Sequence, residues 1–179
     1  MKKDFARILI SREEIAEKIK EVAAKITEDY KGESVLFVCI LKGSIHFYSD
    51  LTREVNLPLT MDFMSISSYG AGTTSSGEVK MLKDLDKTIN GKHVIIVEDI
   101  IDSGNTLSYL MRLLSSRQPA SIKICTLLDK PSRRKVDLSP DYCCFTIPDE
   151  FVVGYGLDYD EIYRNEKEIY VLDPAVYSK

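Results

Sequence analysis

The sequence predicts an α/β protein in which a mainly parallel, twisted sheet is flanked by helices. Strand-like and helix-like apolar patterns alternate along the 179 residues. Runs such as 35–41 and 94–97 are apolar at every position, as strands buried on both faces are. Alternation of this kind implies parallel strands with helices on both sides of the sheet. The length favours a single domain over residues 1–179.

The first predicted helix begins at a capping box, in which Ser11 is followed three residues later by Glu14. Apolar residues then recur at helical spacing at positions 15, 19, 22 and 26. The later elements follow from the same rules. We predict strands over 35–41, 57–63, 94–97, 122–128, 142–147 and 170–172, and helices over 45–52 and 107–114.

Composition and charge exclude several classes of function. The net charge of −4 argues against a nucleic-acid coat and against an anionic membrane surface as partner. The longest apolar run has seven residues, which is too short to cross a membrane. The four cysteines lack metal-ligand spacing and are expected to be reduced thiols, as in cytoplasmic proteins. We therefore expect a cytoplasmic protein with neither nucleic acid nor membrane as partner.

The most informative stretch covers residues 94–107. A buried strand is expected to end at Val97, and Glu98 and Asp99 follow at once. A third acid, Asp102, precedes the turn 103–106, which opens a helix. Backbone amides in such a turn bind phosphate, whereas carboxylates accept hydrogen bonds from ribose hydroxyls or bind Mg²⁺. The stretch predicts a ribose 5-phosphate site, although Asp102 and Ser103 also suit a helix cap, and the two roles are compatible.

A second stretch, residues 67–77, consists of Ser, Gly, Thr and Ala apart from Tyr69. It has little side chain to bury, so it is either a linker or a lid. Strand-like and helix-like patterns continue on both sides within one domain-sized chain, which favours a lid.

Residues 98–106 resemble the 5-phosphoribosyl-1-pyrophosphate (PRPP) signature of type I phosphoribosyltransferases, in the version with Asp102 that hypoxanthine-guanine members carry. Residues 38–44 are similar to the pyrophosphate loop of this family, and Ser68 and Tyr69 to its lid. Residues 128–131 and 151–159 look like its purine-binding segments. The resemblance extends from about residue 35 to 173 and is closest to the short bacterial form. It implies the type I fold with a small hood built from the N- and C-terminal segments.

The resemblance implies an enzyme of purine salvage, which joins hypoxanthine or guanine to PRPP, forms IMP or GMP and releases pyrophosphate with Mg²⁺ as cofactor. Asp102 would be the general base. Glu98 and Asp99 would hold the ribose hydroxyls directly or through Mg²⁺, and Asp158 would meet a second Mg²⁺ through water. The other PRPP ligands implied are Lys42, Gly43, Ser103, Gly104, Asn105, Thr106 and Arg164.

Lys130, Phe151, Val152 and Asp158 would surround the purine, and a mobile lid over about residues 67–79, with Ser68 and Tyr69, would keep water out. Family members form homodimers or homotetramers, and the helical face over 45–52 is one possible contact. The alternative is a regulatory protein on the same fold that binds RNA or nucleotides. The acidic net charge and Asp102 both argue against that alternative.

Overall fold

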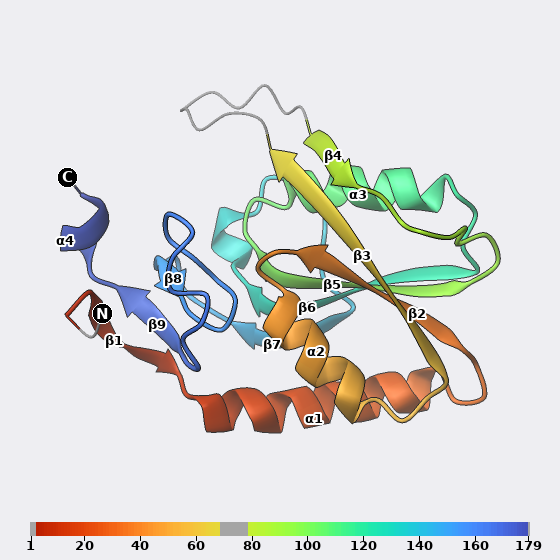
Figure 1. Ribbon diagram of the computed structural model, residues 1–179, viewed down its shortest axis with the longest axis horizontal. Coiled ribbons are helices and arrows are strands. Elements are labelled where there is room, and N and C mark those ends of the chain that lie inside the picture. Colours follow the sequence, from red (N-terminus) through yellow and green to blue (C-terminus); the bar gives the residue numbers. More distant parts are fainter. Residues whose placement is uncertain (1–2, 69–78, 179) are drawn as a thin grey trace.

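The computed structural model describes residues 3–68 and 79–178, and a six-stranded sheet forms its centre (Figure 1). The strand order is β4-β3-β2-β5-β6-β7, and all neighbours pair in parallel except β4 and β3. These strands are β2 Val35–Leu41, β3 Leu59–Ser68, β4 Val79–Lys83, β5 His93–Ile101, β6 Ser121–Asp129 and β7 Tyr142–Thr146. The mainly parallel sheet predicted from the sequence is confirmed.

Helices cover both faces of this sheet (Figure 1). α1 (Arg12–Asp29) and α2 (Ile45–Glu54) pack on one face, and α3 (Asn105–Ser115) packs on the other. Two short helices, η1 (Pro131–Arg133) and α4 (Pro174–Tyr177), lie in the second half of the chain. The capping box is confirmed, because Glu14 N donates to Ser11 Oγ at 3.3 Å and Ser11 N donates to Glu14 Oε2 at 2.8 Å.

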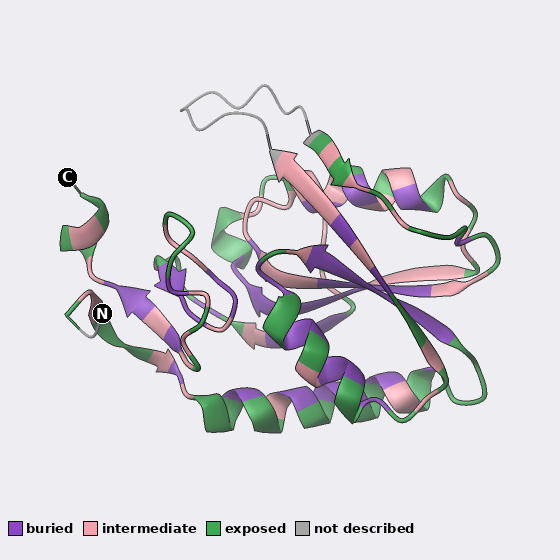
Figure 2. Ribbon diagram, viewed as in Figure 1, coloured by how far each residue is buried: buried purple, intermediate pink, exposed green. Residues whose placement is uncertain are grey.

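Two apolar cores lie on the two faces of the sheet, and alternate residues of each strand supply them. In β2, Phe37 and Cys39 pack toward α1 and α2, whereas Val38 and Ile40 pack toward α3. Figure 2 shows the central strands largely buried. The sheet is therefore a rigid support, and the segments that follow its strands carry the polar side chains.

A smaller antiparallel sheet joins the two ends of the chain (Figure 1). Its order is β1-β9-β8, from β1 (Phe5–Ile10), β9 (Ile169–Leu172) and β8 (Val152–Val153). This sheet is the hood that the resemblance implied. The sequence analysis missed β1, since Ala6, Arg7 and Ile8 are exposed and leave no alternating apolar pattern.

Three further expectations about the strands are corrected. β3 continues beyond residue 63 to Ser68, and it pairs with an edge strand, β4, that was not predicted. Residues 67, 68 and 79 therefore belong to paired strands rather than to a free lid. Tyr69 and the rest of the predicted lid lie outside the described residues. The apolar alternation over 57–63 predicts that Met61 faces the core, but 51% of its surface is exposed and it does not.

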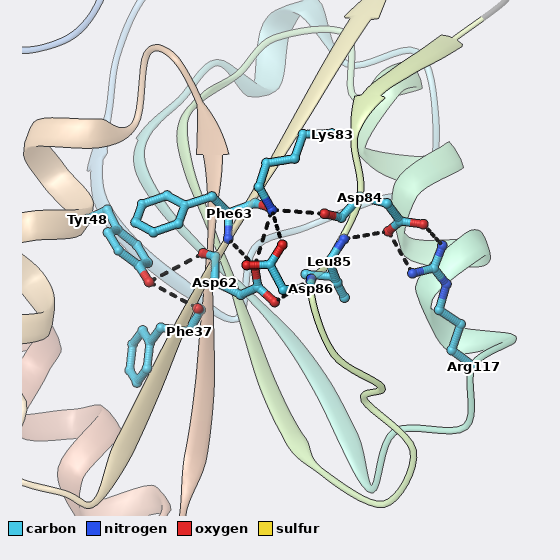
Figure 3. Close-up of polar contacts among 9 residues, drawn as sticks. All are labelled: Phe37, Tyr48, Asp62, Phe63, Lys83, Asp84, Leu85, Asp86 and Arg117. Atoms are coloured by element: carbon cyan, nitrogen blue, oxygen red, sulfur yellow. Dashed lines mark hydrogen bonds and ion pairs between the residues drawn. The ribbon is translucent and has the colours of Figure 1, made fainter.

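A polar clasp fixes the edge strand β4 to β3 (Figure 3). The buried carboxylate of Asp62 accepts hydrogen bonds from the backbone N–H groups of Phe63 at 2.7 Å and Asp86 at 3.0 Å. Lys83 Nζ lies 3.5 Å from Asp62 Oδ1 and 2.9 Å from Asp86 Oδ1. Because the buried carboxylate of Asp62 has hydrogen-bond and ion-pair partners, the clasp holds β4 and the residues after it against β3 without leaving a buried charge unpaired.

No helix in the described part of the chain is long and apolar enough to cross a membrane. All four cysteines are free thiols, as the sequence predicted, and three of them are buried.

Candidate active site

The acidic pair lies on β5, just beyond the point where β5 stops pairing with its neighbour β2. β5 pairs with β2 only as far as Val97, opposite Cys39, but it continues beside β6 to Ile101, opposite Asp129. The expectation that the strand ends at Val97 is therefore wrong. Glu98 and Asp99 belong to the strand, and its side toward β2 is open there, because at Ile40 and Leu41 β2 pairs with β3 but no longer with β5.

A cavity of about 560 Å³, here called the β2–β5 cavity, opens at this edge. The carboxyl ends of the parallel strands lie toward the smaller sheet (Figure 1), and ligands bind at that end of such sheets. Ten of the residues predicted for the site line the cavity. They are Lys42, Gly43, Glu98, Asp99, Asp102, Ser103, Gly104, Thr106, Asp158 and Arg164. The fold therefore brings Lys42 and Asp158, which are 116 positions apart in the sequence, to the same cavity.

The turn before α3 leaves the helix N-terminus open toward this cavity. Gly104 is the N-cap with φ +80, a left-handed conformation that glycine adopts readily, and no side chain caps α3 among the described residues. Ser103 Oγ accepts a long hydrogen bond of 3.4 Å from Asn105 N. The alternative, in which Asp102 and Ser103 cap the helix, does not hold for Asp102, because its carboxylate accepts from Arg133 Nε at 3.0 Å. The free amides and the helix dipole suit a phosphate.

Burial disfavours the charged form of both carboxyl groups of the acidic pair. Desolvation and the negative charge of Asp99 raise the pKa of Glu98 well above its ordinary value. Desolvation also raises the pKa of Asp99, although the hydrogen bond from Ile100 N, at 2.8 Å, and the positive charge of Arg164 oppose this. A cation bound at this edge would relieve the repulsion.

Hard oxygen donors are the ligands that Mg²⁺ prefers, and Glu98, Asp99 and Asp158 supply them. No group of three or more Asp, Glu, His or Cys side chains in the described residues is close enough to enclose a metal ion. The site thus fits a Mg²⁺ ion that one or two carboxylates share with the phosphates of a substrate.

Two cations face these acids across the cavity. Lys42 Nζ contacts Glu161 Oε2 at 2.6 Å, and Arg164 Nη2 contacts Asp158 Oδ1 at 2.8 Å. Arg164 Nη1 also donates to Gly156 O at 2.8 Å. Arg164 Nε is the single buried side-chain nitrogen or oxygen atom in the described chain that has no hydrogen-bond partner. Both cations can bind an anionic leaving group, and a guanidinium can do so with two parallel hydrogen bonds.

Close backbone contacts hold the floor of the cavity together. A Cβ atom on Gly43 would lie 1.6 Å from Asp99 Oδ2, so only glycine lets the carboxylate rest there. Gly156 has φ +104, and a Cβ atom on it would lie 1.9 Å from the carbonyl oxygen of Gly43. These two glycines join the segment after β2 to the segment that carries Asp158.

Asp158 lines the β2–β5 cavity, but the other three predicted purine ligands do not. Lys130 is buried and donates from Nζ to Glu150 O at 2.6 Å. Phe151 remains 39% exposed and stacks on Tyr177, with ring centroids 5.1 Å apart. Val152 is buried in β8, opposite Val171. Of these three residues, Phe151 presents the most accessible surface to a ligand.

A chain of charged contacts links the two regions. Asp102 contacts Arg133, Arg133 Nη1 lies 3.4 Å from Asp149 Oδ2, and Lys130 Nζ lies 3.9 Å from Asp149 Oδ1. The predicted general base and the predicted purine-binding lysine are therefore connected through two residues that the sequence analysis did not name.

One further predicted residue, Asn105, is not among those that line the cavity, and its side chain is exposed. Ser68 is the last residue of β3, and Ser67 before it lines the cavity.

Comparison with known proteins decides the family. Residues 9–160 match the model of the phosphoribosyl transferase domain. This chain belongs to the phosphoribosyltransferase family. Hypoxanthine-guanine phosphoribosyltransferase of Bacillus subtilis is 54% identical over 177 residues, which cover 99% of this chain and 98% of that protein. The enzyme of the same name from Streptococcus thermophilus is 50% identical over 179 residues, which cover 100% and 99% of the two chains.

A solved structure supports the same assignment. The hypoxanthine phosphoribosyltransferase of Staphylococcus aureus superposes with a TM-score of 0.97 at 49% identity, and the match covers 100% of this chain and 97% of that one. This phosphoribosyltransferase therefore has the type I fold that the sequence resemblance implied.

Sequence reasoning missed Arg133 and Glu161, which contact the side chains of Asp102 and Lys42 in this phosphoribosyltransferase. Arg133 ends the short helix η1 and Glu161 lies in a turn, so no apolar period marks either residue, and their partners are 31 and 119 positions away in the sequence. No local signal in the sequence could have paired them.

Proposed function

We propose that this phosphoribosyltransferase transfers the phosphoribosyl group of PRPP to hypoxanthine or guanine, forming IMP or GMP and releasing pyrophosphate. The single observation that carries the proposal is the β2–β5 cavity, in which a phosphate-binding turn, an acidic pair and two cations meet. PRPP has a 5-phosphate, a ribose diol and a diphosphate, so each of these groups has a counterpart in the cavity. The full-length similarity to hypoxanthine-guanine phosphoribosyltransferases supports the choice of purine.

Each residue of the site is assigned to the substrate group that suits its chemistry. The turn 103–106 binds the 5-phosphate through its amides, with Asn105 contributing only its backbone, and Glu98 and Asp99 accept hydrogen bonds from the ribose hydroxyls. Lys42, the Gly43 amide and Arg164 hold the diphosphate as it leaves. Asp102 removes the proton from the attacking purine nitrogen, and Arg133 orients its carboxylate until the purine arrives.

Mg²⁺ is the proposed cofactor. When bound, it neutralises negative charge on the departing pyrophosphate. Glu98 and Asp99 would hold one Mg²⁺ together with substrate oxygens, in keeping with the raised pKa of the acidic pair, and Asp158 would meet a second Mg²⁺ through water.

The purine side of the site is proposed from chemistry and position. Lys130 has three donors and no acceptor, which suits the 6-oxo group and N7 of the purine. Phe151 offers an exposed ring for stacking, and Val152 offers backbone groups to the base edge.

We also propose a homodimer or homotetramer in the cytoplasm. The outer face of α2, with Ile45 43% exposed, offers an apolar contact for a second copy. The four free thiols suit a reducing compartment. The alternative, a regulatory protein that binds RNA or nucleotides, has no support from the similar proteins, whose names are those of enzymes.

One assay tests the proposal. The protein is incubated with PRPP and Mg²⁺, and hypoxanthine, guanine, xanthine, adenine and uracil are offered in turn while pyrophosphate release is measured. Release is expected with hypoxanthine or guanine and not with adenine or uracil. Release with uracil or adenine alone, or with no base, would contradict the proposed specificity.

A further inference from the structure

Glu161 lies between the two cations that the proposed function assigns to the diphosphate of PRPP. Its carboxylate contacts Lys42 Nζ at 2.6 Å through Oε2 and Arg164 Nη2 at 3.2 Å through Oε1. Each oxygen thus binds a different cation. Both cations line the β2–β5 cavity, so one carboxylate bridges them at its edge.

The loop that carries Glu161 adopts an unfavourable backbone conformation. Asp160, Glu161 and Tyr163 have φ values of +51, +65 and +77, in the left-handed region that residues with a Cβ atom rarely adopt. The hydrogen bond from Glu161 N to Asp158 Oδ2, at 2.9 Å, and the pairing of Tyr159 with Ile162 hold the loop in this shape. A surface loop needs no such conformation to expose a carboxylate, and strain of this kind clusters at ligand sites and switches.

A carboxylate and a diphosphate offer the same chemistry to a cation, namely anionic oxygens that accept charge-assisted hydrogen bonds. The two cannot occupy the same donors of Lys42 and Arg164 at once. We propose that Glu161 is an internal stand-in for the diphosphate group: it occupies both cations in the free protein and must leave them when PRPP binds. This inference rests on the proposed function, since that function assigns the two cations to the diphosphate.

Two consequences follow from the exchange. The diphosphate must displace an anion already in place, so Glu161 weakens the affinity for PRPP and for pyrophosphate. The same carboxylate returns to the cations when pyrophosphate leaves, so it favours release of that product. Glu161 is accordingly a residue that sets affinity and does not touch the reacting atoms.

Glu161→Gln tests the inference, because glutamine keeps the size of the side chain and removes its charge. Binding of pyrophosphate is measured by calorimetric titration at fixed Mg²⁺ and fixed ionic strength, and the Michaelis constant for PRPP is measured in parallel. Removal of two exposed ion pairs should tighten binding by about three- to tenfold. The Michaelis constant for PRPP should fall by a similar factor.

Asp160→Asn is the matched control. It removes the same charge one residue away in the same strained loop, and Asp160 has no ion pair among the described residues. Its effect on pyrophosphate binding should stay below about twofold, the size expected of a screened charge. If Asp160→Asn tightens binding as much as Glu161→Gln, general electrostatics explain the gain and the stand-in role is overturned.

A double-mutant cycle separates displacement from a change in loop structure. In a Lys42→Ala background one of the two cations is gone, so the gain from Glu161→Gln should shrink by at least about half. An undiminished gain overturns the inference. Should Glu161→Gln unfold at the assay temperature, Glu161→Asp replaces it, because the shorter carboxylate cannot bridge both cations and should tighten binding by about twofold.

The outcomes distinguish this inference from the proposed function. If the unmodified protein forms IMP or GMP but Glu161→Gln binds pyrophosphate no more tightly, the stand-in role fails alone. If the unmodified protein neither binds pyrophosphate nor uses PRPP, the proposed function fails, and the stand-in role fails with it.

Discussion

Replacing Gly43 with alanine would place a Cβ atom 1.6 Å from Oδ2 of Asp99. Ordinary contact with a Cβ atom begins at 3.4 Å, so the carboxylate must retreat by most of the difference. Asp99 Oδ2 is the end of a side chain that can rotate, and the free energy of unfolding should therefore change by less than about 1 kcal/mol. A misplacement of about 1 Å at a reacting site costs about a hundredfold, so kcat/KM with PRPP should fall at least that far.

The assay compares the steady-state rate with the urea unfolding midpoint of the same preparation. Gly156→Ala is the matched control, because its Cβ atom would meet the backbone oxygen of Gly43 at 1.9 Å and its φ is +104. Backbone cannot move aside as a side-chain tip can, so Gly156→Ala should destabilise the protein by about 2–4 kcal/mol. Normal turnover in Gly43→Ala, or destabilisation equal to that of Gly156→Ala, would refute the reasoning.

Four other substitutions test the site and its support. Asp102→Asn should lower kcat by about a hundredfold or more with little change in the Michaelis constant for PRPP, because it removes only the proton acceptor; steady-state kinetics measure both. Lys42→Ala should raise the Michaelis constant for PRPP by about tenfold, and an unchanged value would count against its pyrophosphate role. The pKa of Glu98 is raised in the folded protein, so without divalent cations its contribution to stability is complete below the ordinary value of 4.5 and is lost as the pH rises through the raised value. Urea unfolding at several pH values should show this decline and a smaller decline in Glu98→Gln. Arg134→Ala leaves the buried carboxylate of Asp129 without its ion-pair partner and should cost about 3 kcal/mol in the free energy of unfolding, measured by urea titration.

The central sheet and the acidic segment with its turn, residues 98–106, could be predicted from the sequence because their signals are local. β2 is apolar on both faces, and its run of seven residues marks both its bounds and its burial. The turn at Gly104 follows a strand and opens a helix, and that order alone places the acids at the ligand end of the sheet. The length of β5 was harder to predict, because acidic residues look like the end of a buried strand until the pairing with β6 is known.

The smaller sheet and the charge pairs could not be predicted, since their reasons are not local. β1 is half exposed and is held by β9, more than 150 residues later in the chain, with Phe5 opposite Leu172. The partners of Asp102 and Lys42, which are Arg133 at the end of η1 and Glu161 in a turn, come near only in the folded chain. The burial of Lys130 could not be predicted either. Its hydrogen bond to Glu150 O joins residues 20 positions apart, which only the folded chain brings together.

The smaller sheet also bears on the order in which the chain is built. The central sheet is complete once residue 146 has been synthesised, but β8 pairs only with β9, and β9 pairs with β1. The segment that carries Phe151 and β8 therefore has no partner strand until β9 has left the ribosome. Folding during translation would deliver the central sheet and the phosphate turn 103–106 first, and a nascent chain stalled after residue 160 would lack both Arg164 and a paired β8.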